Sequence, residues 1–227
     1  MPEPLRYVLT GAPSAGKTTV LEALRHQGYA TVREAATDVI AERQAQGCAE
    51  PWREPAFVDA VAAVQRHRQI EADGPPVAPV DHGLVVADEL RNQGDAGHHN
   101  SMIDASLLRR PTRLYDRSPL CTLALTRHLG RPAGPTLAAE VDRIARQRIY
   151  QRTVFLVSPL GFITRTAARR ISYAESLAFA RVHEQVYEAY GHHLVHVPAG
   201  PVPQRVALIE EHLSALGGDG LGSPNFT

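Results

Sequence analysis

Residues 11–18 read Gly11-Ala12-Pro13-Ser14-Ala15-Gly16-Lys17-Thr18 and match the P-loop pattern G-x-x-x-x-G-K-[ST]. They lie between a predicted buried strand, Tyr7–Thr10, and a helix predicted from Gly16 to about Gln27. Glycines let the backbone pass close to a phosphate, and the helix directs the positive end of its dipole toward it. In this pattern Lys17 reaches the β- and γ-phosphates, and the Thr18 hydroxyl ligates Mg²⁺. The predicted nucleotide contacts are Gly11, Ala12, Pro13, Ser14, Ala15, Gly16, Lys17, Thr18 and Thr19.

Length and composition indicate one globular domain, or at most two small ones, and argue against a protein dedicated to binding nucleic acid or an anionic membrane. The chain has 227 residues, of which 44% are hydrophobic and 21% charged, so it can bury a core. Its 24 basic and 24 acidic residues cancel, whereas nucleic-acid and anionic-membrane binders show a basic excess. We expect a cytoplasmic protein, because the two cysteines lie far apart and the sequence has neither a membrane-spanning apolar run nor a signal-peptide pattern.

Position 17 differs from every other basic position in the chain. Lys17 is the only lysine in the chain, and the other 23 basic residues are arginines. An ammonium is a compact point charge, whereas a guanidinium is planar and more weakly hydrated. The exception suggests that position 17 requires a point charge.

Predicted strands alternate with predicted helices, which indicates an α/β fold with a five-stranded parallel sheet and helices on both faces. The strands are expected at about 7–10, 29–32, 113–115, 153–157 and 194–197. The helices are expected at about 16–27, 35–46, 56–71, 120–129, 137–150, 172–190 and 206–216. Residues 1–216 therefore form one predicted domain, with an insertion or mobile loop at 74–111, a lid at 162–171 and a flexible tail at 217–227.

Two large classes of P-loop proteins do not fit the sequence. GTPases of the Ras type recognise guanine with an Asn-Lys-x-Asp motif, and this chain has no second lysine to supply one. The Leu-Ser-Gly-Gly signature of transporter ATPases is also missing from the sequence. Small-molecule and nucleotide kinases remain, together with compact ATPases.

Four motifs follow one another in a familiar order: Gly11–Thr18, Arg33-Glu34-Ala35-Ala36, Asp116-Arg117-Ser118-Pro119 and Ala167-Ala168-Arg169-Arg170-Ile171-Ser172. From about residue 5 to 213 the chain resembles the NadR-like AAA-domain family of P-loop ATPases and kinases, which includes the ribosylnicotinamide kinase half of NadR. The layout is also similar to thymidylate and deoxynucleoside kinases. The resemblance implies a nucleoside-kinase-like fold with an arginine-rich lid. Residues 74–110 depart from the family's pattern.

Two carboxylates are candidates for catalysis. Glu34 follows the second strand, at the sheet edge where α/β proteins bind ligands, and could accept the proton of an attacking hydroxyl. The similar deoxynucleoside kinases use a glutamate there in this way; the alternatives are a salt bridge to Arg33 or a helix cap. Asp116 ends the third strand and is favoured as the carboxylate that holds Mg²⁺. Asp88 is the alternative metal ligand, and Asp116 could instead form a turn before Pro119.

Arginines supply the predicted positive charge around the transferred phosphate. Arg117 is expected to face the substrate or a phosphate. Arg165, Arg169 and Arg170 lie between the fourth strand and the next helix, where nucleoside kinases carry a mobile lid. Guanidinium groups there would neutralise charge on the transferring phosphoryl group. The alternative is a solvated basic face.

These observations predict a kinase that uses ATP and Mg²⁺ and transfers the γ-phosphate to a hydroxyl of a nucleoside-like or other small polar acceptor. In this hypothesis the catalytic residues are Lys17, Glu34, Asp116, Arg117, Arg165, Arg169 and Arg170, and Thr18 and Asp116 hold the metal. The expected partners are ATP and the acceptor, with the chain acting as a monomer or homodimer. The alternative is a regulatory or switch ATPase of the same family that acts through a protein partner.

Overall fold

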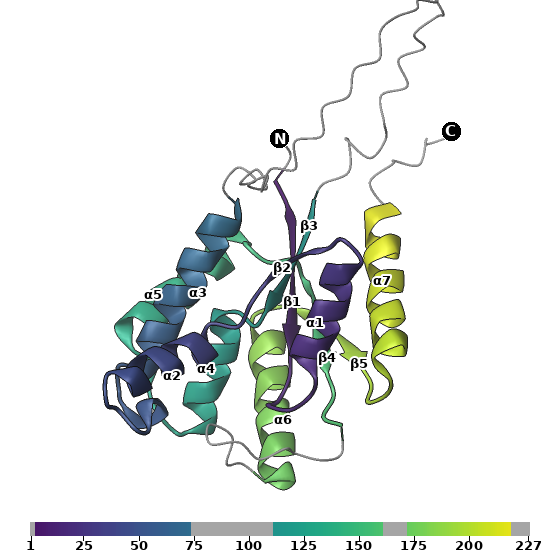
Figure 1. The fold of residues 1–227 in the computed structure, drawn as a ribbon. Helices are drawn as coiled ribbons and strands as arrows, with labels where there is room; N and C mark the ends of the chain where they lie inside the picture. Colours follow the sequence, from purple (N-terminus) through teal and green to yellow (C-terminus); the bar gives the residue numbers. More distant parts are fainter. Residues whose placement is uncertain (1–2, 74–110, 161–171, 219–227) are drawn as a thin grey trace, which may run out of the picture.

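Five strands pair in parallel in the order β2-β3-β1-β4-β5, which confirms the predicted sheet (Figure 1). The computed structural model describes residues 3–73, 111–160 and 172–218. The strands are β1 (Leu5–Thr10), β2 (Ala30–Val32), β3 (Thr112–Asp116), β4 (Thr153–Val157) and β5 (His193–Val197). Because β1 is the central strand, the P-loop that follows it leaves from the middle of the carboxyl edge of the sheet.

Helices cover both faces of the sheet, as predicted. They are α1 (Lys17–His26), α2 (Ala36–Ala45), α3 (Phe57–Asp73), α4 (Pro119–His128), α5 (Pro135–Gln147), α6 (Tyr173–Ala189) and α7 (Val202–Gly218), with a short 3₁₀ helix, η1, at Pro51–Arg53. Helices α1 and α7 lie on one face, and α3, α4, α5 and α6 lie on the other (Figure 1).

The central strand is buried on both sides, which explains the apolar run Tyr7-Val8-Leu9 within it. Val8 belongs to the core that contains residues of α2 to α6, whereas Tyr7 and Leu9 belong to the core under α1 and α7. Side chains of a strand alternate between the two faces, so one short segment contributes to two cores. Full burial of an aliphatic side chain such as Leu9 contributes about 1.5–3 kcal/mol.

Local signals fix where several helices begin and end. The Ser118 hydroxyl accepts a hydrogen bond from the Leu120 amide at 3.3 Å, so α4 begins at Pro119, which occupies the first helical position. Helix α5 begins at a proline as well, two residues before the predicted start. It ends at Gln147, earlier than predicted, because Arg148 adopts the left-handed conformation with φ 49°.

Most of the predicted insertion, lid and tail lies outside the described residues. From the insertion at 74–111 only Pro111 is described, and the lid at 162–171 is outside completely. Helix α7 ends at Gly218, so its last two residues, Gly217 and Gly218, fall within the expected tail. Helix ends fray, and a boundary shift of this size is common.

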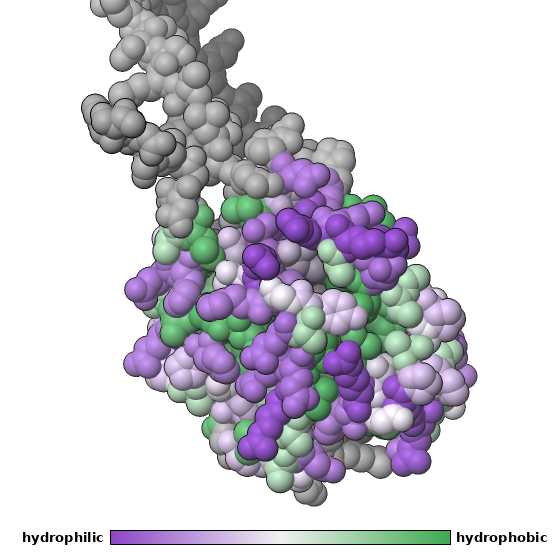
Figure 2. Space-filling view, turned by 180° about the vertical axis from the view of Figure 1, so that it is seen from behind, coloured by the Kyte–Doolittle hydropathy of each residue, from purple (hydrophilic) through white to green (hydrophobic). Residues whose placement is uncertain are grey.

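The face opposite to that of Figure 1 is mixed in character. Hydrophilic residues are spread over it, with hydrophobic residues between them in smaller areas (Figure 2). Of the helices in the described ranges, none combines the length and the apolar character that a bilayer crossing requires.

The start of α6 gives a test of local stability. Ser172 and Glu175 form a capping box, in which each side chain accepts a hydrogen bond from the other's backbone amide, at 3.2 and 2.6 Å. We expect Ser172→Ala to lower the free energy of unfolding by about 1 kcal/mol, measured by urea denaturation. The control is Ser214→Ala, at an exposed position inside α7, which should cause no loss. If both variants were as stable as the parent, the box would contribute nothing.

Candidate active site

The carboxyl ends of β1, β2 and β3 bring the predicted site residues to one edge of the sheet. Leu9 of β1 is paired in register with Asp116 of β3, and the Arg117 amide donates to the Leu9 carbonyl at 3.0 Å. The P-loop therefore starts beside Asp116 and Arg117. Glu34 follows β2, the next strand beyond β3. Parallel pairing alone thus gathers segments that are far apart in the sequence.

Positive φ angles shape the P-loop. Gly11, Ser14 and Gly16 have φ values of 133°, 64° and 80°. At position 11 a side chain is excluded as well, because a Cβ would lie 2.4 Å from the Val157 carbonyl oxygen at the end of β4. The first glycine of the motif is therefore required by the close approach of the loop to β4 and by its own backbone conformation.

Lys17 is folded back onto the loop that precedes it. Its Nζ donates to the carbonyls of Gly11 and Ala12 at 3.0 and 2.9 Å, and the residue is 6% exposed. Burial, reinforced by the Arg117 charge, lowers the pKa of Lys17 from 10.5 to about 7, although nearby carboxylates oppose this shift. A bound phosphate would supply the negative charge that favours the ammonium form.

Thr18, in the first turn of α1, contacts Asp116 at the end of β3. The Thr18 hydroxyl donates to Asp116 Oδ2 at 3.3 Å. Asp116 Oδ1 is buried and has no hydrogen-bond partner within the described ranges. Burial raises the pKa of Asp116, although the Lys17 and Arg117 charges partly offset this effect. A hydroxyl and an orphaned carboxylate oxygen are hard oxygen ligands of the kind Mg²⁺ prefers, so these two residues fit the metal.

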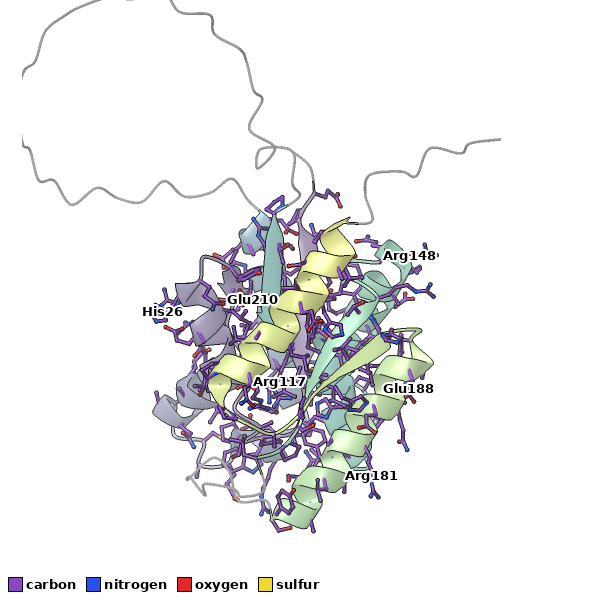
Figure 3. The ribbon with its side chains drawn as sticks, turned by 90° about the vertical axis from the view of Figure 1, so that its right-hand side faces the viewer. His26, Arg117, Arg148, Arg181, Glu188 and Glu210 are labelled. Atoms are coloured by element: carbon purple, nitrogen blue, oxygen red, sulfur yellow. The ribbon has the colours of Figure 1, made fainter. Side chains whose placement is uncertain are left out.

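Glu34 is bound to Arg117 in a chain of hydrogen bonds that reaches α6. Arg117 Nε donates to Glu34 Oε1 at 2.6 Å, and the Thr37 hydroxyl donates to Glu34 Oε2 at 3.0 Å. On its other side Arg117 Nη1 lies 3.3 Å from His183 Nε2. His183 Nδ1 lies 2.9 Å from the Phe179 carbonyl, which can only accept, so Nδ1 carries the proton and Nε2 accepts from Arg117. In the view of Figure 3 Arg117 lies near the lower end of α7, and 12% of its side chain is exposed.

The charges of this chain are set by its surroundings. Burial by itself would raise the pKa of Glu34, but Arg117 and Lys17 hold it below its ordinary value, so the carboxylate is ionised at neutral pH. Burial also lowers the pKa of His183 well below its usual range, with the Arg117 charge adding to the shift. The backbone of Arg117 itself is in the left-handed region, with φ 75°, a strained conformation of the kind found at functional sites.

Neither structural alternative for Glu34 describes its contacts. Arg33 pairs with Asp38, and α2 has no side-chain cap at its start. Arg68 of α3 donates to the backbone carbonyls of Arg33 and Glu34 and forms an ion pair with Asp38. The segment between β2 and α2 is therefore held by α3, which leaves the Glu34 carboxylate directed to Arg117.

The structure brings together six of the predicted groups: the P-loop backbone, Lys17, Thr18, Asp116, Arg117 and Glu34. The other predictions, Asp88, Arg165, Arg169 and Arg170, lie outside the described residues, and their roles stay predictions. Two buried basic side chains, His183 of α6 and Arg205 of α7, were not predicted from the sequence. Both bind mainly backbone carbonyls or partners distant in sequence, so no motif marks them.

Comparison with known proteins connects this geometry to a family. The family model described as AAA domain matches residues 6–90 and 93–205. Thymidylate kinase from Ehrlichia chaffeensis is 11% identical, with a TM-score of 0.52, and the match covers 93% of this chain and 100% of that one. Deoxyadenosine kinase from M. mycoides is 14% identical, with a TM-score of 0.48 and the same coverage of both chains. A comparison with curated proteins gave no match.

The lowered pKa of Lys17 predicts a specific pH dependence of stability. Between pH 7 and 10.5 the unfolded chain keeps the Lys17 proton that the folded chain has lost, so the free energy of unfolding rises with pH. The rise should approach about 1.4 kcal/mol per pH unit relative to Lys17→Met, in which this proton is absent. Urea denaturation at pH 7.5, 8.5 and 9.5 measures it. Parallel pH profiles for the two proteins would show that Lys17 keeps its ordinary pKa.

The buried His183 gives a second prediction. His183→Leu removes the hydrogen-bond acceptor of Arg117 Nη1 and leaves this partly buried donor unsatisfied. The free energy of unfolding should therefore fall by about 1–3 kcal/mol. His193→Leu, at an exposed position on β5, is the control and should change it by less than about 0.5 kcal/mol. Chemical denaturation at pH 7 measures both. A similar, small effect of the two substitutions would contradict a supporting role for His183.

Proposed function

Since the chain belongs to the AAA domain family and has the fold of a P-loop kinase, we propose that it is an ATP- and Mg²⁺-dependent small-molecule kinase. The γ-phosphate of ATP passes to a hydroxyl of a nucleoside-like or other small polar acceptor. The family and the fold by themselves allow either a phosphotransferase or an ATPase. The choice of a kinase rests on the groups beside the P-loop.

The nucleotide side of the proposed site consists of the P-loop and its neighbours. Loop amides and Lys17 bind the phosphates, and Thr18 and Asp116 hold Mg²⁺, which would neutralise charge on the β- and γ-phosphates. The buried Asp116 Oδ1, orphaned in the described part of the chain, and the low pKa of Lys17 support this assignment. Burial disfavours the charged form of each residue, and Mg²⁺ or a triphosphate would supply further opposite charge beside it.

The observation that carries the kinase proposal is the Glu34–Arg117 pair. Glu34 follows β2, two strands away from the P-loop strand β1, and between them lie Asp116 at the end of β3 and Arg117 directly after it. Neighbouring strands lie about 4.8 Å apart, so the backbone at Glu34 lies on the order of 10 Å from the start of the P-loop, a separation that a small acceptor can span. The ionised carboxylate can accept the proton of the acceptor hydroxyl, and Arg117 holds it in place.

The proposal is tested by measuring ADP release from ATP and Mg²⁺ against a panel of nucleosides, nucleoside monophosphates and other hydroxylated small molecules. We expect one compound to stimulate release and to appear as its phosphorylated product. Slow hydrolysis that no compound stimulates would overturn the kinase and favour the switch ATPase, whose partner is a protein.

Two substitutions separate the predicted roles. Glu34→Gln should lower acceptor-dependent transfer by about 10²-fold or more, because it removes the proton acceptor, and should leave ATP binding within a few fold. Lys17→Ala should abolish transfer without unfolding the domain. Glu22→Gln, in an exposed pair with Arg25 on α1, is the matched control and should transfer phosphate at the parental rate. Parental turnover by Lys17→Ala or Glu34→Gln would show that the corresponding role is wrongly assigned.

A further inference from the structure

Arg205 lies in the first turn of α7 and contacts the second half of the P-loop, whereas Lys17 contacts the first half. Its Nη1 donates to the Ala15 carbonyl at 2.8 Å, and its Nη2 donates to the Ser158 carbonyl at 3.1 Å. Ser158 follows β4, and its amide donates to the Val197 carbonyl of β5 at 2.9 Å. A single guanidinium therefore joins the P-loop to the ends of β4 and β5.

The guanidinium of Arg205 is buried, and no carboxylate of the described residues forms an ion pair with it. The residue is 3% exposed, its Nε has no hydrogen-bond partner, and no carboxylate pairs with it in the parts of the chain that are described. Burial accordingly lowers the pKa of Arg205, and no acidic group of the described residues acts against this shift. Carbonyl dipoles replace only part of the lost hydration of a cation, so a position like this one is unfavourable unless a further negative group approaches.

The contact with Ala15 determines how the next peptide group points. In a trans peptide the carbonyl of one residue and the amide of the next are directed oppositely, and the described chain has no cis peptide bond. When Arg205 holds the Ala15 carbonyl, the Gly16 amide is turned away from the guanidinium. A Cβ on Gly16 would lie 3.0 Å from Arg205 Nη1, so this glycine fits closely against the arginine.

Lys17 acts on the other half of the loop in the same way. Its ammonium holds the carbonyls of Gly11 and Ala12, while Arg205 holds that of Ala15. Two buried basic side chains thus bind the carbonyl groups of both halves of the loop. The amide groups of the loop, which would donate to an anion, are directed away from these two side chains.

We propose that Arg205 is a positioning residue for the nucleotide, one that holds the P-loop in its phosphate-binding conformation through the Ala15 carbonyl and adds uncompensated positive charge beside it. The ligand class is a polyphosphate, and the inference rests on the nucleotide side of the proposed function. It does not depend on the identity of the phosphate acceptor.

The test compares the binding of inorganic tripolyphosphate and of ATP by isothermal titration calorimetry. Arg205→Met, which keeps the length but removes the charge and both donors, should weaken the binding of both probes at least 10-fold. Arg205→Lys keeps the charge but loses the planar fork, so it should give an intermediate loss. Arg181→Met, on the exposed face of α6 where the side chain points outward (Figure 3), should bind within twofold of the parent.

A second measurement separates positioning from a general effect on stability. Amide hydrogens of residues 11–19 should exchange faster in the Arg205 variants, whereas those of β4 should not change. Parental affinity for tripolyphosphate in a folded Arg205→Met protein would overturn the inference. If that variant does not fold, parental affinity and parental loop exchange in Arg205→Lys would overturn it equally. A parent protein that binds neither probe would overturn the nucleotide site itself, and the proposed function with it.

Discussion

The close passage of the P-loop across the end of β4 is the constraint on which the site depends. At Gly11 the backbone comes so near to the Val157 carbonyl that a Cβ would lie 2.4 Å from its oxygen. This approach sets the loop over the carboxyl edge of the sheet, between Asp116 on one neighbouring strand and Ser158 after the other. Helix α1 then begins at Lys17, so its positive end faces the same point.

The charges around this loop are unbalanced in a way that a nucleotide and its metal would correct. Lys17 has a lowered pKa and Asp116 a raised one, both mainly because burial disfavours the charged forms. Glu34 and Arg117 form an ion pair, and His183 accepts a hydrogen bond from the arginine on the side away from Glu34. The site thus combines a fixed ion pair, Glu34 with Arg117, with a buried lysine and a buried carboxylate whose charges are only partly compensated by their surroundings, an arrangement suited to Mg²⁺ and a polyphosphate.

Local sequence signals were sufficient where the structure depends on neighbours in the chain. The capping box of Ser172 and Glu175, the strand Thr153–Val157 and the glycine pattern of the P-loop could each be read directly. The proline-defined starts of α4 and α5 show that small boundary errors arise when apolar periodicity is followed instead of caps. His183 and Arg205 carried no signal, because their partners are Arg117 and backbone carbonyls up to 190 residues away.

The sequence by itself determined the fold class, the phosphate loop and the candidacy of Glu34 and Asp116, since periodicity, glycine spacing and strand ends are local properties. Only the tertiary structure decided that Glu34 pairs with Arg117 rather than Arg33, and that Asp116 meets Thr18. It also decided that His183 contacts Arg117, and that Arg205, with no carboxylate paired to it among the described residues, contacts the P-loop. These outcomes follow from strand order and helix packing, which bring distant residues together and remove them from water. Strand order and helix packing depend on the whole chain and cannot be inferred from any single segment of it.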